Sequence, residues 1–383
     1  MQSPLFFGSE IYRGSSYGAH HPLRVPRVST VMDLSRALGW LGPDQYRPSP
    51  RAKAAALTIW HTPGYVAALE TAERVQDVSD ETRAQHGLGT VSNPVFPEMF
   101  RRPATAAGAS LLAGELLAQP GVIHHPGGGT HHGFPDRAAG FCYLNDAVLA
   151  ILALRRAGVG RIAYVDIDAH HADGVEHGLA GDPDTLLISV HEDRRWPFTG
   201  ALEEDGGGNC LNLPVPRGLN DTEMAEIREA LILSAVAAFE PEAIVLQCGA
   251  DAVEEDPLSR LSLSNNAHWD VLRGLMDLGC PRLMVLGGGG YNPWSVGRLW
   301  TGVWAVLNRH DIPERLPKDA EEVLRALRWD RSRAGRNPPE HWFTTLRDAA
   351  RPGPVRPEIT DLIALLSRRP AARGRISDLL SQD

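Results

Sequence analysis

Five apolar segments of strand length each end in polar or glycine-rich residues, and this repeated pattern constrains the fold more than any other feature of the chain. The segments are 121–125, 161–170, 185–191, 243–251 and 282–290. Apolar runs of this length are typical of strands buried on both faces of a parallel sheet. Helical patterns lie between them at 145–157, 221–239 and 266–278, the second with a cap-like start. The alternation predicts a doubly wound α/β fold.

The polar residues after these segments indicate where a site would lie. In open α/β sheets, ligands bind outside the carboxyl ends of the strands, so we expect a site built from strand-end loops. No repeat of fixed period is present, and no clean linker precedes residue 310. We predict one domain over 1–310 and an Arg/Pro-rich extension over 311–383 that packs on it, with a helix near 359–367.

The loop with the most chemistry follows the 161–170 segment. While the strand stays extended, period-two alternation puts Asp166, Asp168 and His170 on one side. Carboxylate and imidazole groups are common ligands of zinc. The acids could instead cap the next helix, but three acids and two histidines in residues 166–173 are costly to desolvate without a cation or an equivalent network. We therefore favour a metal site.

Asp251, at the end of the 243–251 segment, is the candidate third ligand. Taken alone, it could equally be a helix N-cap, and only the first cluster favours the metal. Asp168, His170 and Asp251 would leave open positions on zinc for water and substrate, which is typical of a catalytic site.

The loop after the 121–125 segment contains three glycines followed by His131 and His132. Hydrolysis of an amide needs a general base and a proton for the leaving amine, and two imidazoles of near-neutral pKa suit both tasks. Asp166 and Asp173 are the spare acids that could fix the tautomers of these rings. An exposed glycine turn, or an imidazole pair on a second metal, are the alternatives.

Four glycines at 287–290 precede Tyr291. A loop of this kind can deliver the phenol into a pocket, where it would donate to a carbonyl oxygen and stabilise developing negative charge. A phosphate-binding loop is the alternative, but the Lys-Ser/Thr of a P-loop and the spacing of a dinucleotide fingerprint are both missing.

Together these segments resemble the histone deacetylase family, and more closely its bacterial acetoin-utilisation branch. The resemblance runs from about residue 17 to residue 300, and its motifs follow the family's order. They are Gly-Gly-Gly-Thr-His-His at 127–132, Gly-Phe-Cys-Tyr-Leu-Asn-Asp at 140–146, Asp-Ile-Asp-Ala-His-His at 166–171, Gly-Ala-Asp at 249–251 and Gly-Gly-Gly-Gly-Tyr at 287–291. The resemblance implies an arginase-like, three-layer α/β/α fold with a mostly parallel sheet. It also implies a deacetylase domain over 1–310 that hydrolyses an N-acyl amide.

The resemblance further implies roles for single residues. Zinc would lie on Asp168, His170 and Asp251, beside the catalytic pair His131 and His132, with Tyr291 polarising the carbonyl. A potassium ion would be held by Asp166, Asp168, His170 and Ser189. The tunnel for an acyl-lysine stem would be lined by Gly140, Phe141, Leu258 and Trp196 or Phe198. Arg27 would lie toward an internal channel through which acetate leaves.

Three positions depart from the family pattern. Ser92 stands near the rim, where many relatives carry an aspartate that grips the substrate backbone, so this position bears on peptide substrates. The segment 194–200 differs from the family's Phe-Pro-Gly loop, which bears on the width and depth of the tunnel. Ala172 replaces the usual glycine.

Three other functions compete with lysine deacetylation. A polyamine deacetylase would need an acid in the tunnel where Leu258 stands, although Glu98 or Glu203 could supply one. An arginase-like enzyme would use two manganese ions and a second aspartate at the position of Val253. A binding protein that had lost catalysis is disfavoured by the intact set of ligands, histidines and tyrosine.

Charge and cysteine content limit the partners. With 47 acidic and 38 basic side chains the net charge is −9, which disfavours binding to nucleic acid or an anionic membrane. Neither a signal peptide nor a membrane span is recognisable. The four cysteines form no CxxC pair, so neither a thiolate zinc site nor a disulfide framework is expected, and a reducing cytoplasm fits best. We expect an acylated lysine or other acylated amine as substrate, and the number of subunits stays open.

Overall fold

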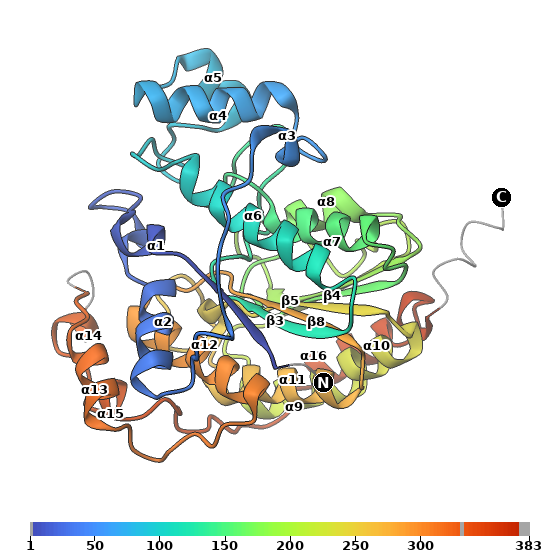
Figure 1. Cartoon of the computed structure of the whole chain (residues 1–383). Coiled ribbons are helices and arrows are strands. Elements are labelled where there is room, and N and C mark those ends of the chain that lie inside the picture. The colour runs from blue at the N-terminus through green and yellow to red at the C-terminus, as the bar shows by residue number, and fades with distance from the viewer. Residues whose placement is uncertain (1–2, 330–332, 375–383) are drawn as a thin grey trace, which may run out of the picture.

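A parallel sheet of eight strands forms the middle layer of the computed structural model, which describes residues 3–329 and 333–374 (Figure 1). The strand order is β2-β1-β3-β8-β7-β4-β5-β6, and every neighbouring pair is parallel. The strands are β1 (Leu5–Gly8), β2 (Tyr46–Pro48), β3 (Gly121–His125), β4 (Ile162–Asp166), β5 (Thr185–Glu192), β6 (Cys210–Val215), β7 (Ala243–Gln247) and β8 (Arg282–Leu286).

Helices cover both faces of this sheet, so the chain has the predicted three-layer α/β/α fold (Figure 1). One face carries α6 (Arg101–Leu116), α7 (Asp146–Arg156) and α8 (Asp173–Leu179). The other carries α2 (Val28–Ala37), α9 (Asp221–Ile227), α10 (Ser234–Phe239), α11 (Asn265–Asp277) and α12 (Pro293–Asn308).

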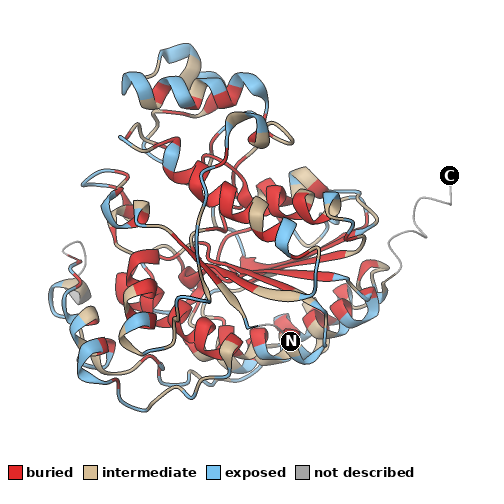
Figure 2. Ribbon diagram, viewed as in Figure 1, coloured by how far each residue is buried: buried red, intermediate tan, exposed pale blue. Residues whose placement is uncertain are grey.

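The period of two along each strand divides the interior into two cores. In β4, Ile162 and Tyr164 pack with α6, α7 and α8, whereas Ala163 and Val165 pack with the helices of the opposite face. The inner sides of the helices are buried and their outer sides are exposed (Figure 2). Burial of both faces explains why the strands read as continuous apolar runs in the sequence.

The helix predicted over 221–239 is present as α9, a π-helical segment (Arg228–Leu233) and α10. Three of the predicted strands are shorter than their apolar patterns. β4, β7 and β8 end at Asp166, Gln247 and Leu286, so the polar and glycine-rich residues beyond them form loops. Those loops lie at one edge of the sheet, because the strands are parallel.

A smaller lobe stands above α6 and consists of α3 (Ala54–Leu57), α4 (Pro63–Val75) and α5 (Asp80–His86) (Figure 1). The short α1 (Ile11–Gly14) follows β1. The lobe contributes to a third cluster of buried side chains, which also includes Tyr17, Tyr143 and Tyr291. It therefore packs beside the strand-end loops.

The segment after residue 310 contains α13 (Lys318–Arg325), α14 (Arg333–Arg336), α15 (His341–Thr344) and α16 (Pro357–Leu366), the last of which matches the predicted helix. Trp342 stacks on Trp294 of α12, with 5.3 Å between the ring centroids. Ile359 and Leu366 are buried in the same core as α9 to α12. The division of the chain at residue 310 stays a prediction.

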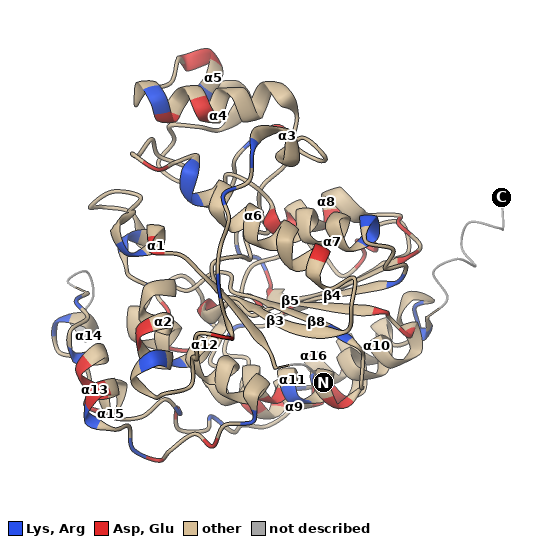
Figure 3. Cartoon of the chain, in the orientation of Figure 1, with Lys and Arg blue, Asp and Glu red and all other residues tan. Residues whose placement is uncertain are grey.

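Charged side chains gather on the outer helices and loops, with both signs interspersed on α4, α5 and α13 (Figure 3). Within the described residues, no helix combines the length and the apolar character needed to cross a membrane.

One buried ion pair joins the C-terminal segment to the core. Arg298 on α12 is fully buried and lies 2.6 Å from Asp348, which also accepts a hydrogen bond from the backbone N–H of Asn265 (3.0 Å). Asp348→Ala would leave the guanidinium buried and unpaired, so we expect the free energy of unfolding to fall by about 3–5 kcal/mol.

Urea denaturation measures this change, with Glu322→Ala as the control. The Glu322 side chain is 63% exposed and pairs with Lys318 across one helical turn, so its removal should change stability by less than about 1 kcal/mol. Equal effects of the two substitutions would contradict the assigned importance of the buried pair.

Candidate active site

Three side chains that could hold a metal ion converge where two neighbouring strands end. Asp168 and His170 follow β4, and Asp251 lies in a short 3-10 helix (Ala250–Ala252) after β7. Because β4 and β7 pair in parallel, these loops meet at the same edge of the sheet. One donor atom from each residue lies within 4.8 Å of the others, and all three residues are buried. Nδ1 of His170 lies 3.2 Å from Oδ1 of Asp168 and 3.0 Å from Oδ2 of Asp251.

The electrostatics of this cluster favour a cation. Burial raises the pKa of Asp251, and the neighbouring Asp168 raises it further. Burial alone would lower the pKa of His170, but Asp251 and Asp168 raise it to about 10. Two carboxylates and an imidazole around one point are a donor set that suits a divalent metal ion, and three protein ligands leave positions open.

Backbone groups fix the two carboxylates. Asp168 accepts a hydrogen bond from the N–H of Gly289 (2.7 Å), and Asp251 accepts one from the N–H of Ala169 (3.0 Å). A Cβ at Gly289 would lie 2.0 Å from Oδ2 of Asp251, so only glycine fits there. The alternative role of Asp251 as a helix N-cap does not apply, because Gly249 occupies the capping position.

The two histidines lie side by side beside the metal-binding cluster, with 4.0 Å between their ring centroids. His131 Nδ1 is 2.8 Å from Asp166 Oδ2, and His132 Nδ1 is 2.6 Å from Asp173 Oδ1. The structure therefore brings together the two pairs that the sequence suggested, each with a carboxylate that orients the imidazole.

These two imidazoles have different proton affinities. Burial lowers the pKa of His132 to about 4, and the neighbouring His131 adds to the effect. Burial also acts to lower the pKa of His131, but Asp166 and Asp168 outweigh it and raise this pKa to about 9. At neutral pH, His132 can accept a proton and His131 carries one, which is the combination that amide hydrolysis requires.

Tyr291 reaches the same pocket from the four-glycine loop after β8. Its ring packs edge-to-face on Phe141, with 5.7 Å between the centroids. Burial raises the pKa of Tyr291 well above its usual value, so the phenol keeps its proton and remains a hydrogen-bond donor. Its backbone N–H donates to the buried Asp256 (2.6 Å), which ties the glycine loop to the loop after β7.

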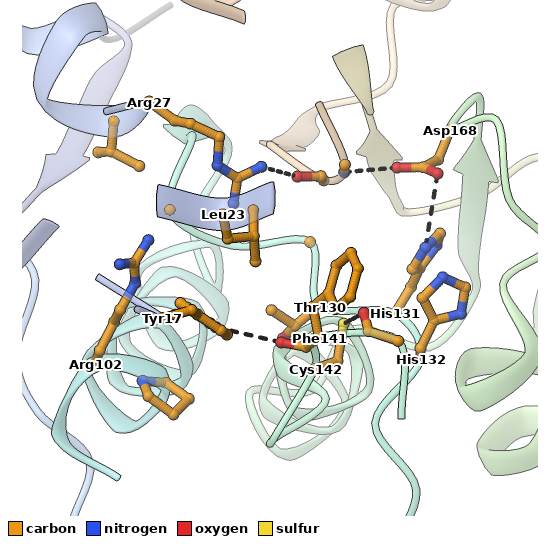
Figure 4. Close-up of a pocket in the computed structure, with 18 of the residues that line it drawn as sticks. Tyr17, Leu23, Arg27, Arg102, Thr130, His131, His132, Phe141, Cys142 and Asp168 are labelled. Carbon is orange, nitrogen blue, oxygen red and sulfur yellow. Dashed lines mark hydrogen bonds and ion pairs between the residues drawn. The ribbon is translucent and has the colours of Figure 1, made fainter. Parts of the chain in front are cut away.

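One pocket brings most of these groups together, and Asp251 adjoins it through His170 (Figure 4). Gly140 and Phe141 line it together with both histidines, Asp168, His170 and Tyr291. The rest of its lining includes Tyr12, Tyr17, Leu23, Arg27 and Arg102, and Figure 4 shows Tyr17, Arg27 and Arg102 across the pocket from Asp168 and the histidines.

The other residues predicted to form the wall of the tunnel are Trp196, Leu258 and Phe198. The ring of Trp196 is 4.6 Å from that of His132 and 6.3 Å from that of His170, so Trp196 faces the site. Leu258 packs against the buried cluster that contains Tyr291. Phe198 is 73% exposed, and its N–H closes a turn with the carbonyl of Arg195 (2.8 Å). Trp196, Phe198 and Leu258 are not among the residues that line the pocket itself, so their place in a tunnel wall stays a prediction.

The sequence analysis also singled out Ser189, Arg27 and Ser92. Ser189 pairs with Asp166 in the β4–β5 register, and its hydroxyl lies 3.0 Å from Nδ1 of His191. Arg27 donates to the carbonyl of Gly288 (2.6 Å), next to the glycine that binds Asp168 (Figure 4). Ser92 is exposed at the position predicted for the rim.

Sequence reasoning missed several residues that shape this site. Asp146 is fully buried and accepts hydrogen bonds from the backbone N–H groups of Gly129 (3.1 Å) and Thr130 (2.7 Å), so it holds the histidine loop. Its place at the start of α7 resembles an ordinary helix cap, which hides this role. Tyr12 and Arg102 belong to no motif, and no sequence signal points to them.

Comparisons with known proteins agree with this geometry. A histone deacetylase domain model matches residues 21–307. The acetoin utilization protein AcuC of Bacillus subtilis (strain 168) is 31% identical over 379 residues, covering 94% of this chain and 95% of that protein. Histone deacetylase 9 of Arabidopsis thaliana is 32% identical over 317 residues, covering 80% and 74%. The crystal structure of an HDAC homolog from Aquifex aeolicus matches with a TM-score of 0.88 and 33% identity, covering 95% of this chain and 100% of that one. The structure of an HDAC homolog complexed with SAHA matches with a TM-score of 0.86, at the same identity and coverage.

Proposed function

The chain belongs to the histone deacetylase family, and we propose that it is a zinc-dependent deacetylase whose substrate is acetyl-lysine in a protein or peptide. One observation carries this proposal. The three metal-binding side chains, the histidine pair and the Tyr291 phenol, which were expected from separate motifs, line or adjoin one pocket.

Asp168, His170 and Asp251 would hold the zinc ion. Their donor atoms lie within 4.8 Å of one another, and oxygen and nitrogen donors are ordinary zinc ligands. When bound, zinc supplies Lewis-acid polarisation of the acyl carbonyl and activation of water.

The protein groups provide the proton transfers. His132, unprotonated at neutral pH, accepts the proton of the attacking water, and protonated His131 has one to give to the leaving amine. Asp166 and Asp173 hold the two rings in place. The phenol of Tyr291 donates a hydrogen bond to the acyl oxygen as negative charge develops on it.

The lining of the pocket favours an acyl-lysine over an acylated polyamine. A polyamine carries cationic amines and would be stabilised by acids along the pocket. Asp168, which we assign to the metal ion, is the single acid among the lining residues. Neither Glu98 nor Glu203 is among the lining residues, and Leu258 keeps its position apolar.

Release of acetate by the zinc-loaded protein tests the substrate. An acetyl-lysine peptide and an acetylated polyamine are offered separately at equal concentration, and we expect a higher kcat/KM for the peptide. A higher value for the polyamine would replace the substrate assignment. Acetate release from neither compound would refute the proposed activity.

Other parts of the proposal come from family resemblance. We propose a potassium ion beneath the zinc, held by Asp166, Asp168, His170 and Ser189, of which Asp166 and Ser189 are register partners in the sheet. We also place the protein in the cytoplasm, which agrees with the four free cysteines.

A further inference from the structure

The C-terminal segment that joins α15 to α16 contacts the loop after β7 outside the pocket (Figure 1). In this segment Arg351 forms an ion pair with Glu254 and another, at 2.6 Å, with Glu255. Its backbone is fixed as well, because its N–H donates to Asp221 at the start of α9 (2.8 Å). The side chain of Glu255 is only 14% exposed, so its charge needs a cationic partner. Arg351 therefore holds residues 254 and 255 in place.

The next residue of this loop holds Tyr291. The carboxylate of the buried Asp256 accepts hydrogen bonds from the backbone N–H groups of Tyr291 (2.6 Å) and Leu258 (2.9 Å). The carbonyl of Glu255 accepts a hydrogen bond from the side-chain amide of Asn292 (3.4 Å). Residues 255 and 256 therefore contact both Tyr291 and the residue that follows it.

The backbone before Tyr291 depends on such hydrogen bonds. Gly290 directly precedes the tyrosine, has a φ of +133° and brings no side chain that could pack. A shift of residues 254–256 would therefore reach Tyr291 through its bond to Asp256. Misplacement of a catalytic group by about 1 Å can lower a rate by about 100-fold, so a small shift is enough to matter.

We propose that Arg351 is a positioning residue for the phenol of Tyr291, acting from the C-terminal segment through residues 254–256. The connection consists of the ion pairs of Arg351, the backbone of this loop, and the hydrogen bond from Tyr291 to Asp256. Arg351 is not among the residues that line the pocket, so its effect on turnover is indirect. This inference rests on the proposed role of Tyr291 and adds the C-terminal segment to the residues that support it.

Arg351→Met tests the inference in the zinc-loaded full-length protein with an acetyl-lysine peptide. We expect kcat to fall by about 10- to 100-fold. The KM and the zinc content should stay near the wild-type values, because the phenol stabilises charge that develops only during the reaction. Arg351→Lys keeps the charge but loses the planar guanidinium, so it should recover part of the lost kcat.

A double-mutant cycle with Tyr291→Phe shows whether Arg351 acts through the phenol. When the hydroxyl is already absent, its position no longer matters. Arg351→Met should then change kcat by less than about twofold, because the two substitutions affect the same interaction. A residue that only stabilised the fold would lower kcat by the same factor with and without the hydroxyl.

Arg356→Met is the matched control. Arg356 immediately precedes α16, its side chain is 30% exposed like that of Arg351, and it pairs with the fully buried Glu223 of α9. Its removal should lower the free energy of unfolding, because a buried carboxylate loses its partner. It should leave kcat unchanged at a temperature where the variants are folded, because α9 carries none of the candidate site residues.

Asp256→Asn takes the place of Arg351→Met if that variant does not fold. Asparagine keeps the volume, but its amide nitrogen cannot accept a hydrogen bond, so one of the two bonds from the backbone is lost. We expect a similar fall in kcat, and again almost none in the Tyr291→Phe background.

Three results would refute the positioning role of Arg351. They are an unchanged kcat in the variant tested, an equal effect with and without the Tyr291 hydroxyl, and an equal fall of kcat in Arg356→Met. If Tyr291→Phe alone leaves kcat unchanged, or if the wild-type protein releases no acetate, the proposed function fails, and this inference fails with it.

Discussion

Tyr291→Phe is expected to lower kcat by about two to three orders of magnitude while the protein keeps its full metal content. The substitution removes only the phenolic hydroxyl, and loss of one preorganised donor to a developing oxyanion typically has an effect of this size. Packing should survive, because the ring remains free to pack on Phe141 and the backbone N–H still donates to Asp256. Steady-state kinetics with an acetyl-lysine peptide and metal analysis of the same samples check both parts.

Tyr46→Phe is the matched control for this experiment. Tyr46 lies on β2, at the edge of the sheet and outside the pocket lining, so its hydroxyl should not affect turnover. If Tyr291→Phe turned over substrate as fast as Tyr46→Phe, the assigned role of the Tyr291 phenol would be wrong.

Asp251→Ala is expected to abolish both metal retention and activity. The substitution removes one of three donors, and two remaining protein ligands bind zinc much more weakly than three. After gel filtration in metal-free buffer, the wild-type protein should keep about one equivalent of zinc and the variant almost none.

The matched control here is Asp270→Ala. Asp270 lies on α11, its side chain is 46% exposed, and it pairs with Arg273 at the surface. This variant should retain metal and turnover. An Asp251→Ala protein that still held a full equivalent of zinc would show that the third ligand lies elsewhere.

Much of the fold could be predicted from the sequence because the sheet is parallel and buried. β3 was predicted at its observed bounds, and β4, β5, β7 and β8 were found from their apolar runs. The same burial makes the end of a strand hard to predict, because the apolar residues can continue beyond the last hydrogen bond to the neighbouring strand. The predicted segment 161–170 thus includes Asp168 and His170, which lie in the loop after β4.

β1, β2 and β6 were not predicted. β1 and β2 have only four and three residues, and β2 lies at the edge and contains a proline, so neither gives a clear pattern. In β6, Asn212 and Pro214 interrupt the apolar residues. These strands are stabilised by pairing with strands that are distant in the sequence, and a local sequence pattern does not predict such pairing.

Some residues of the site could likewise be predicted from the sequence, and others could not. His131, His132, Asp168 and Tyr291 stand in motifs of unusual composition, so their chemistry could be read before their geometry was known. Arg102 is one of the many arginines of the chain and stands in no motif, and only the structure shows that it is buried and lines the pocket. Phe198 shows a further limit: it is apolar and two residues from Trp196, but the ring of Trp196 packs on His132 whereas Phe198 is 73% exposed, a difference that the sequence does not show.

The most direct test of the account is a zinc titration of the metal-free protein, with acetate release from an acetyl-lysine peptide as the readout. We predict negligible release without metal, and a rise in proportion to bound zinc that ends at one equivalent. Release at full rate from metal-free protein, or none at one equivalent, would contradict the assignment of Asp168, His170 and Asp251 as the centre of a zinc-dependent deacetylase.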